Sequence, residues 1–418
     1  MKKVFVILLS LISLVSFAKG AEVLNWKECV KEAAKNNPSL AASLQSIEQS
    51  KAQKWIATSP MLPQISAESG VNKSNSFSGN SEKNKYDYSV QGEQLIFDGF
   101  KTYNDVKSAK EDITAAKFNN ALISSEVRYN LKTAFVDLLR AQSMVSIAQD
   151  IIQRRKQNYE MIGLSYESGR EHEGSLLLAK ADLQKAQFDL KKAERDVSVA
   201  RYALRKVMGW EKNTPVTVKG EFRLSLSSKD EPNLEALANK HPQVKMSEAE
   251  KNSAKYGVGS AKAEFFPEIN LNARAGKVGV GISSDDKGWT VGLGASLPIF
   301  EGGRRIANTQ KAHARLNEAV YNEKSDYDAV LSTLEESWQT FQDAIEEVSV
   351  QQSYLEAAKV RAKISRAQYA NGLLIFDNWI IIEDNYVNAE KNYLNSEANM
   401  LRAEALWVKA KGGALDYE

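Results

Sequence analysis

Cysteine and histidine are scarce in this sequence of 418 residues. Cys29 is the only cysteine, so the chain cannot form an intrachain disulfide. The three histidines, His172, His241 and His313, do not stand at metal-ligand spacing from one another or from Cys29. No phosphate-binding loop motif is visible either. The sequence therefore predicts no metal site and no cofactor, and Cys29 is interpreted as a buried thiol.

Long hydrophobic runs are also missing beyond the N-terminal segment. Hydrophobic residues make up 43% of the chain, and the mean hydropathy is −0.41. These values exclude a bundle of transmembrane helices but allow a membrane β-barrel, in which only alternate strand residues face lipid. The charges nearly cancel, at a formal net charge of +2, which gives no electrostatic reason to expect nucleic acid as a partner.

The N-terminal segment has the pattern of an export signal. A charged start and an apolar run over residues 4–17 are followed by the small residues Ala18 and Gly20. Residues 1–20 are therefore predicted to be a secretory signal peptide that is removed from the mature protein. The alternative is an uncleaved membrane anchor, for which the run is short. Cys29 lies nine residues past the cleavage point, so we expect no lipid at the mature N-terminus.

The rest of the chain matches itself at a shift of 203 or 204 residues. Each half should therefore build the same structural unit. We expect a first repeat over 21–210, a linker over 211–230, a second repeat over 231–413 and a tail over 414–418. The evidence is a set of motifs that recur in the same order: Asn37-Pro38 with His241-Pro242, Leu62-Pro63 with Phe266-Pro267, Ile96-Phe97-Asp98-Gly99 with Ile299-Phe300-Glu301-Gly302, and Tyr166-x-x-Gly169 with Tyr369-x-x-Gly372.

Each repeat contains two candidate strands. Apolar and polar residues alternate over 64–72 and 86–97 in the first repeat, and over 268–280 and 289–300 in the second. Such alternation is typical of a strand with one apolar face. Four strands are too few to close a membrane barrel, so they need partners from other chains; two hairpins of a soluble β-domain are the alternative. Several aromatic residues fall near the strand ends, as a membrane-interface girdle requires: Tyr86, Tyr88, Phe97, Trp289 and Phe300.

Long helices are expected between and after the strands. Apolar residues recur at alternating steps of four and three over 101–162, 171–208, 303–370 and 374–411, which is the spacing of a left-handed coiled coil. A helix over 101–162 is about 90 Å long at ~1.5 Å per residue. That length suits crossing a gap between two membranes better than filling a globular core.

The signal peptide, the tandem repeat, the paired strands and the long helical hairpins together resemble the outer-membrane efflux protein (TolC) family. The resemblance covers nearly all of the mature chain, and it rests on the order of motifs that are individually weak. It implies a mainly α-helical protein with membrane β-structure. Three protomers would each give four strands to a twelve-stranded β-barrel, and their helices would form a coiled-coil α-barrel in the periplasm.

The resemblance also implies a function and partners. The homotrimer would be a passive exit duct in the outer membrane of a Gram-negative-type bacterium, in contact with outer-membrane lipid. It would export small molecules or polypeptides together with a periplasmic adaptor and an inner-membrane pump of the RND type or an ABC transporter. Gating in this family occurs around the two helix–helix turns, which here lie near Gly169 and Gly372.

This sequence departs from the family pattern at the gate. Members place an acidic residue six residues past the second glycine and often another three later, where this chain has Asn378 and Ile381. Asp377 is one residue earlier, so it is a candidate for the constriction, with an exposed turn aspartate as the alternative. Related ducts also hold the closed state by hydrogen bonds between turns; the matching tyrosine is Tyr369, and the matching acidic position is Ser175. We therefore expect a weaker lock, formed between Tyr369 and Ser175.

The extreme tip of the turns is where an adaptor should dock. The candidate residues are Gly169, Arg170, Glu171, Gly372 and Leu373; for any of them a solvated loop residue is the alternative. We do not expect an enzyme, because the acid/base candidates beside Glu171 occupy a turn with no convergent pocket. Two other classes remain as alternatives. A periplasmic coiled-coil adaptor would carry a single hairpin, and a fibrous structural protein would not need the strand pairs.

Overall fold

A computed structural model describes residues 22–74, 83–210, 216–224, 232–280 and 286–416. The expected signal peptide, the loops between the paired strands and most of the expected linker lie outside these residues. The described chain divides into two compact units. The first unit comprises residues 22–37, Leu131–Arg223 and Glu347–Arg402, and the second unit comprises Pro38–Asn130, Leu224–Glu346 and residues 403–416.

Helices dominate the described chain, and the two longest have 67 residues each. At ~1.5 Å per residue such a helix is about 100 Å long. Among the described residues, no helix combines the length and the apolar character that a membrane span needs. The helices are α1 (Trp26–Asn36), α2 (Pro38–Thr58), α3 (Lys101–Glu167), α4 (Glu173–Met208), α5 (Leu234–Lys240), α6 (Pro242–Ala263), α7 (Arg304–Ala370) and α8 (Phe376–Ala410), with a short 3-10 turn, η1 (Ser59–Met61).

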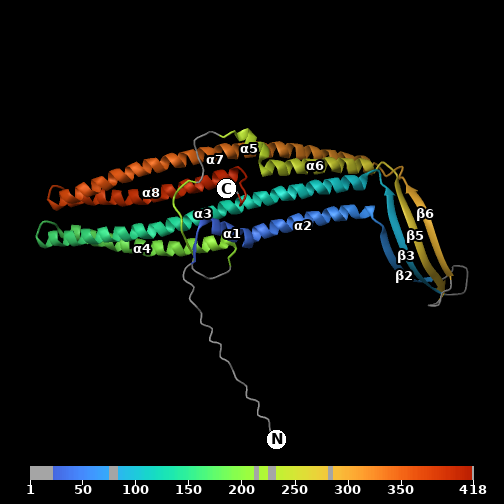
Figure 1. The fold of residues 1–418 in the computed structure, drawn as a ribbon, viewed down its shortest axis with the longest axis horizontal. Coiled ribbons are helices and arrows are strands. Elements are labelled where there is room, and N and C mark those ends of the chain that lie inside the picture. The colour runs from blue at the N-terminus through green and yellow to red at the C-terminus, as the bar shows by residue number, and fades with distance from the viewer. Residues whose placement is uncertain (1–21, 75–82, 211–215, 225–231, 281–285, 417–418) are drawn as a thin grey trace, which may run out of the picture. The chain divides into compact units, whose positions relative to one another are not determined.

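The second unit contains a four-stranded antiparallel sheet with the order β2-β3-β5-β6 (Figure 1). The strands are β2 (Gln64–Ser74), β3 (Lys83–Phe97), β5 (Glu268–Val280) and β6 (Asp286–Ser296). Pairing of β3 with β5, from Lys85 opposite Val280 to Phe97 opposite Ile269, joins the strand pair of one repeat to that of the other. Strand β6 ends before the expected residue 300, because Pro298 has no N–H for a strand ladder. Phe300 therefore lies beyond the sheet.

One face of this sheet is apolar and open. Ile65, Val90, Leu271, Val291 and Leu293 lie on this face according to the strand register, and their side chains are 39–76% exposed. The opposite face carries polar partners such as Gln91 and Glu68, whose side chains form a hydrogen bond of 2.6 Å. The alternation found in the sequence thus separates an apolar face from a polar face across all four strands.

The two strand–helix junctions use the same motif differently. In the first repeat, Asp98 accepts a hydrogen bond of 2.7 Å from the backbone N–H of Thr102 and caps the start of α3. In the second repeat, Glu301 instead pairs with Arg304 and Arg305 at the start of α7. Arg305 is buried and also donates to the backbone carbonyls of Glu264 and Pro298. A repeated acidic residue therefore holds both junctions, but through different partners.

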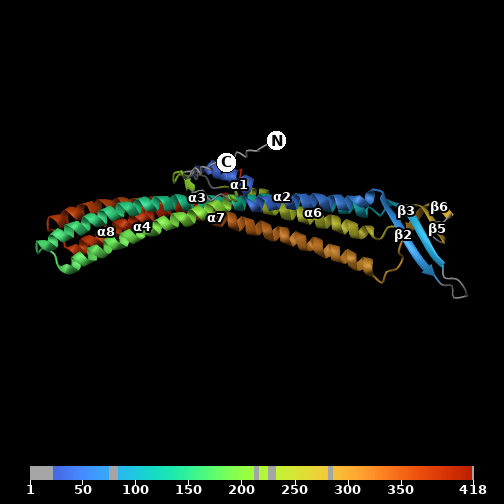
Figure 2. The same ribbon diagram turned by 90° about the horizontal axis from the view of Figure 1, so that it is seen from below.

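The first unit contains two helical hairpins, made by α4 with the C-terminal half of α3 and by most of α8 with the C-terminal part of α7 (Figures 1 and 2). The predicted heptad seam of α3 is buried at Leu131, Leu138 and Ala148. The four-and-three spacing predicts Ile152 as the next buried position after Ala148. The buried positions instead shift to Ile151, Arg155, Asn158 and Ile162. The predicted seam is confirmed up to Ala148. The shift was not predicted, because two of the new buried positions, Arg155 and Asn158, are polar and do not appear in an apolar pattern.

Several elements were not expected from the sequence. Helix α2 precedes the first strand pair and α6 the second, and both begin with a proline at the first helical position, which suits its fixed backbone angle. In the expected linker, β4 (Val216–Val218) pairs in parallel with β1 (Glu22–Leu24). In the second unit, α5 packs in a buried cluster with Trp338, Phe341 and Trp407.

Candidate functional site

Two helix–helix turns close the hairpins at one end of the first unit, and both have the same backbone geometry (Figure 1). Gly169 and Gly372 have φ angles of +74° and +72°, in the left-handed region that favours glycine. The N–H groups of Gly169 and Arg170 donate to the carbonyls of Tyr166 and Ser165, and Gly372 and Leu373 repeat these bonds with Tyr369 and Gln368. This is the Schellman motif, so the repeated Tyr-x-x-Gly pattern is a helix-ending signal.

An aromatic cluster lies directly behind the turns. The ring of Tyr369 stacks on Trp379, with ring centroids 4.5 Å apart and planes within 7° of parallel. Phe376 meets both rings edge-on, at 6.5 and 6.3 Å. Ile162 of α3 and Ala179 of α4 are buried in the same cluster. The cluster therefore packs the α7–α8 turn against the α3–α4 hairpin through apolar contacts.

The hydroxyl of Tyr369 makes a polar contact between the two turns. It donates a hydrogen bond of 2.9 Å to Oε1 of Glu171. Burial of the ring, the hydrogen bond and the charge of Glu171 raise the pKa of Tyr369 to about 12, so the hydroxyl keeps its proton at any physiological pH. The expected contact of Tyr369 with Ser175 is replaced by this one within the protomer. Glu171, expected only as a docking residue, is the acceptor.

Ser175 has a local role instead. Its side chain is buried, and its hydroxyl lies 3.3 Å from Nε2 of His172. The backbone N–H of Ser175 donates to Nδ1 of His172, at 3.3 Å, so His172 caps the start of α4. Capping satisfies a backbone donor that has no partner inside the helix. Ser175 therefore lies at the base of the turn, and its hydroxyl contacts His172 rather than Tyr369.

The other predicted gate residues form an exposed stripe on α8. Asp377, Asn378 and Ile381 are all exposed, and the spacing of three and four residues places them on one helix face. Asp377 also lines a hollow of about 510 Å³ between the two turns, together with Tyr369 and Glu171. Among the tip residues, Gly169, Arg170, Gly372 and Leu373 are exposed, while Glu171 is half-buried. The structure thus brings Tyr369 and Glu171 together, and among the residues that it describes no side chain pairs with the α8 stripe.

Charged residues add a second set of links between the hairpins. Arg155 of α3 is buried and pairs with Asp384 of α8, and its Nη1 atom lies 3.8 Å from Asp182 of α4. Burial raises the pKa of Asp182, as does the charge of Asp384, and Arg155 opposes both effects.

The neighbouring Arg154 pairs with Glu390 of α8 and lies 4.5 Å from the ring centroid of Tyr386. Further along, Lys391 of α8 pairs with Asp189 of α4 at 3.2 Å. The α3–α4 and α7–α8 hairpins are therefore joined by an aromatic cluster, one hydrogen bond at the tip and several ion pairs.

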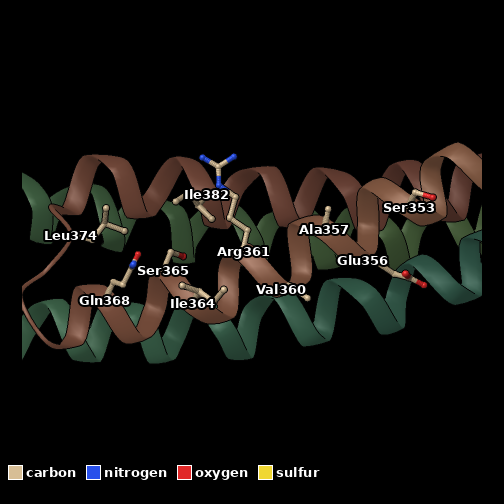
Figure 3. A pocket seen from close by; sticks show the side chains of 10 residues that line it. All are labelled: Ser353, Glu356, Ala357, Val360, Arg361, Ile364, Ser365, Gln368, Leu374 and Ile382. Carbon is tan, nitrogen blue, oxygen red and sulfur yellow. The ribbon is translucent and has the colours of Figure 1, made fainter.

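A shallow groove of about 740 Å³ runs along α7, with α8 contributing Ile382 to its lining (Figure 3). Its lining mixes apolar and charged side chains: Val360 and Ile364 are 58% and 53% exposed, and Glu356 and Arg361 lie beside them. Leu374 of the turn and Ile382 of α8 complete the groove (Figure 3). The groove ends near the turns, so the tip and this flank of α7 form one continuous exposed region.

Sequence reasoning missed Trp379 and the arginine pairs because it followed apolar periodicity alone. Aligning the two repeats at a shift of 203 residues shows that these residues occur in only one repeat. Trp379 aligns with Leu176, and Arg155 aligns with Ala358. The structure gives Trp379 and Arg155 contacts between or within the hairpins that Leu176 and Ala358 cannot make.

Comparisons with known proteins agree with this architecture. The model of a family described as outer membrane efflux protein matches residues 29–210 and 233–412, one segment for each repeat. SilC from Salmonella typhimurium, a probable outer membrane lipoprotein, is 22% identical over 83% of this chain and 77% of its own length. The outer membrane efflux protein BepC from Brucella suis is 23% identical over 79% of this chain and 72% of its own.

The fold is also found in solved structures. The crystal structure of the open state of the MtrE outer membrane channel from Neisseria gonorrhoeae superposes with a TM-score of 0.83 at 18% identity. The superposition covers 94% of this chain and 90% of that one. The strand pairs and the two helical hairpins are therefore elements of a shared fold.

Proposed function

Because this chain belongs to the outer membrane efflux protein family, we propose that three copies of it assemble into a passive exit duct of the outer membrane. A periplasmic adaptor and an inner-membrane pump of the RND type or an ABC transporter supply the coupling and the energy. The duct contributes a path and a gate, and no catalytic chemistry is assigned to it.

The four-stranded sheet is the observation that carries this proposal. Its apolar face is exposed in the single chain, and its outer strands, β2 and β6, are each 11 residues long with one unpaired edge. A long unpaired edge is unstable in a bilayer, where every backbone polar group needs a partner. Joining the β6 edge of one copy to the β2 edge of the next satisfies both edges, and three copies give a closed ring of twelve strands.

The gate follows from the contacts between the hairpins. In this proposal the closed state is held inside each protomer by the hydrogen bond between Tyr369 and Glu171 and by the ion pairs of Arg154 and Arg155. The exposed stripe of Asp377, Asn378 and Ile381 lines the constriction when three copies meet. We call the hydrogen bond between Tyr369 and Glu171 the latch. The adaptor contacts the tip residues, Gly169, Arg170, Gly372 and Leu373, and its binding competes with the latch.

Assembly and conduction test the proposal directly. The mature chain, extracted from outer membranes in detergent, is expected to run as a trimer by light scattering and to give discrete conductance steps in planar bilayers. A periplasmic adaptor would instead stay soluble as a monomer without detergent, and a fibrous protein would give no conductance. Either of those results would remove the proposal.

The mature N-terminus is proposed to be free of lipid, in contrast to the relative SilC, a probable outer membrane lipoprotein. Cys29 is fully buried in α1, so an acyl chain cannot be attached there while α1 is folded. Mass spectrometry of the intact mature chain should give the mass that starts at Ala21, with no acyl addition. A mass increase of one or more acyl chains would show that the proposal is wrong.

A further inference from the structure

Two lysines face each other at the end of the sheet that is farthest from the helices. Lys277 of β5 and Lys287 of β6 are direct cross-strand partners, and both side chains are exposed. Direct partners point to the same side of a sheet. In the register, this pair continues the row that contains Leu271 with Leu293 and Ala273 with Val291. The lysines therefore lie on the apolar face, at its outer end.

The length of the strands places the lysine pair near one edge of the membrane's apolar band. Lys277 is eight residues from Ile269, where β5 leaves the junction with α6. At ~3.4 Å per residue the separation along the strand is about 27 Å. A strand tilted by about 35–45° then rises about 19–22 Å, most of the ~25 Å height of the apolar band of an outer-membrane barrel. All four strands meet their helices or turns at the Ile269 end. The lysine pair therefore lies at the opposite edge of the apolar band.

Aromatic side chains adjoin the pair, as they do at a membrane interface. Trp289 is the next residue on the same face of β6 and is 79% exposed. Tyr88 of β3 is the direct partner of Lys277 on its other side and is 44% exposed. Tryptophan and tyrosine prefer the level of the lipid headgroups, and lysine side chains extend from there toward polar groups.

Two like charges that face each other across strands destabilise a sheet. Within the part of the chain that the structure describes, neither Lys277 nor Lys287 has an ion pair or a hydrogen bond through its side chain. Asp286, the neighbouring acidic residue, pairs with Val278 and so points to the other face. An anionic group from outside the chain is the simplest partner that relieves this repulsion.

We propose that Lys277 and Lys287 bind the phosphate groups of a phosphorylated lipid in the outer leaflet of the membrane. This inference rests on the proposed function, because it requires the sheet to span the outer membrane. The Cβ atoms of direct cross-strand partners lie about 5 Å apart. The two lysine ammonium groups therefore reach one phosphate or two adjacent phosphates. The exposed ring of Trp289 packs on the lipid's upper acyl region. Three copies in a trimer present three such sites, each facing the membrane.

A membrane lipid is favoured over a soluble phosphate compound or a protein. An apolar row of the sheet and exposed aromatic rings flank the lysine pair. The site therefore offers ammonium groups for a phosphate and apolar surface for an acyl chain, and a phosphorylated lipid uses both. A soluble anion uses only the first of these. Each lysine near a charged membrane surface strengthens binding by about fivefold.

Fluorescently labelled lipid A in dodecyl maltoside micelles is the probe, titrated with the full-length purified protein and followed by anisotropy. The test variant is Lys277→Gln with Lys287→Gln. The matched control is Lys311→Gln with Lys324→Gln, two exposed lysines of α7 in the same unit. We expect roughly 25-fold weaker binding for the test variant at low salt, about fivefold for each lysine, and no change for the control. The difference should shrink at high salt.

Three further arms separate the possible explanations. Dephosphorylated lipid A should bind the wild type and the test variant equally weakly. Inorganic phosphate should not displace lipid A at equal concentration; full displacement would mean a site for free phosphate and would overturn the lipid assignment. Lys277→Glu replaces the like-charge pair by an opposite-charge pair, so it should keep or raise the melting temperature while lipid A binding is lost. Retained lipid A binding in Lys277→Glu would also overturn the inference.

The test is separable from that of the proposed function. Micelle binding needs no channel, and conductance of the test variant in phosphatidylcholine bilayers needs no phosphorylated outer-leaflet lipid. If the test variant conducts like the wild type but both bind lipid A equally, only this inference fails. If the wild type gives no channels, the proposed function fails, whatever the lysines bind.

Discussion

Removal of one oxygen atom from Tyr369 should loosen the closed duct. Tyr369→Phe deletes the hydrogen bond to Glu171 and keeps the stacking of the ring on Trp379. A hydrogen bond to a charged acceptor contributes about 1.5–3 kcal/mol. Glu171 is only half-buried, so we take the lower value, about 1.5 kcal/mol. If the bond exists only in the closed state, the open-to-closed ratio rises about 12-fold for each protomer.

Planar-bilayer recording gives the open probability that this prediction concerns. Tyr166→Phe is the matched control, because Tyr166 occupies the same position in the first repeat and is 41% exposed. It should leave the open probability unchanged. Because the pKa of Tyr369 is raised to about 12, its hydroxyl stays protonated below pH 10. The latch is then fully present up to that pH and is lost only as the pH rises through about 12.

A double-mutant cycle tests whether Glu171 is the partner that matters. Glu171→Gln alone should open the duct to a similar degree, and the double variant should add little, with a coupling energy of about 1.5 kcal/mol. Additive effects of the two single variants would refute the latch, even if each variant changed the conductance. An unchanged open probability in Tyr369→Phe would refute it more simply.

Three other predictions follow from buried groups and glycine geometry. Burial and the charge of Glu28 raise the pKa of Cys29 to about 12, so a thiol reagent such as DTNB should react with the native protein at least 100-fold more slowly than in denaturant. Burial lowers the pKa of His241; its stability contribution is present above pH ~6.5 and is lost as the pH falls, so His241→Asn should flatten the acid side of the melting-temperature profile. Gly99→Ala should destabilise by about 2–4 kcal/mol in thermal unfolding, since a Cβ would lie 2.6 Å from a backbone oxygen of the second unit. Gly302→Ala, with open space around it, should lose only about 1 kcal/mol.

The sequence predicted the elements whose signal is periodic. Alternation in β5 and β6 predicted which residues share a face, and Leu271 and Leu293 do lie on one face, as direct partners. The seam of α3 follows from heptad spacing up to Ala148. Helix α2 escaped prediction because it is weakly amphipathic, and only Ser43 and Ile47 are buried along its 21 residues. Such a helix has no continuous apolar stripe in its sequence. Apolar periodicity therefore does not predict it, and its formation depends on packing against other parts of the protein.

The site was less predictable than the fold, for a physical reason. Tyr369 could be singled out by its motif, but its acceptor could not. The acceptor is set by how the two turns are packed against each other, which depends on Trp379 and Phe376 behind them. Ser175 was expected to take that role because of its aligned position. The cap that His172 places on α4 draws Ser175 into the base of the turn, and Glu171, four residues earlier, reaches the hydroxyl instead.

The two repeats differ at the positions that join the hairpins in the structure. Matched positions that keep their chemistry, such as the two turn glycines, serve the backbone in both repeats. Positions that have diverged carry the contacts between the hairpins, and in each case one repeat has a neutral or smaller residue where the other has the functional one: Glu171 against Leu374, Trp379 against Leu176, Arg155 against Ala358, and Asp384 against Ala181. Tyr369 aligns with Tyr166 and Glu171 with Leu374, so the mirrored contact would join Tyr166 to residue 374, where leucine offers no hydrogen-bond acceptor. The divergence at residue 374 therefore leaves the proposed latch with one hydrogen bond, between Tyr369 and Glu171, where two identical repeats could form two.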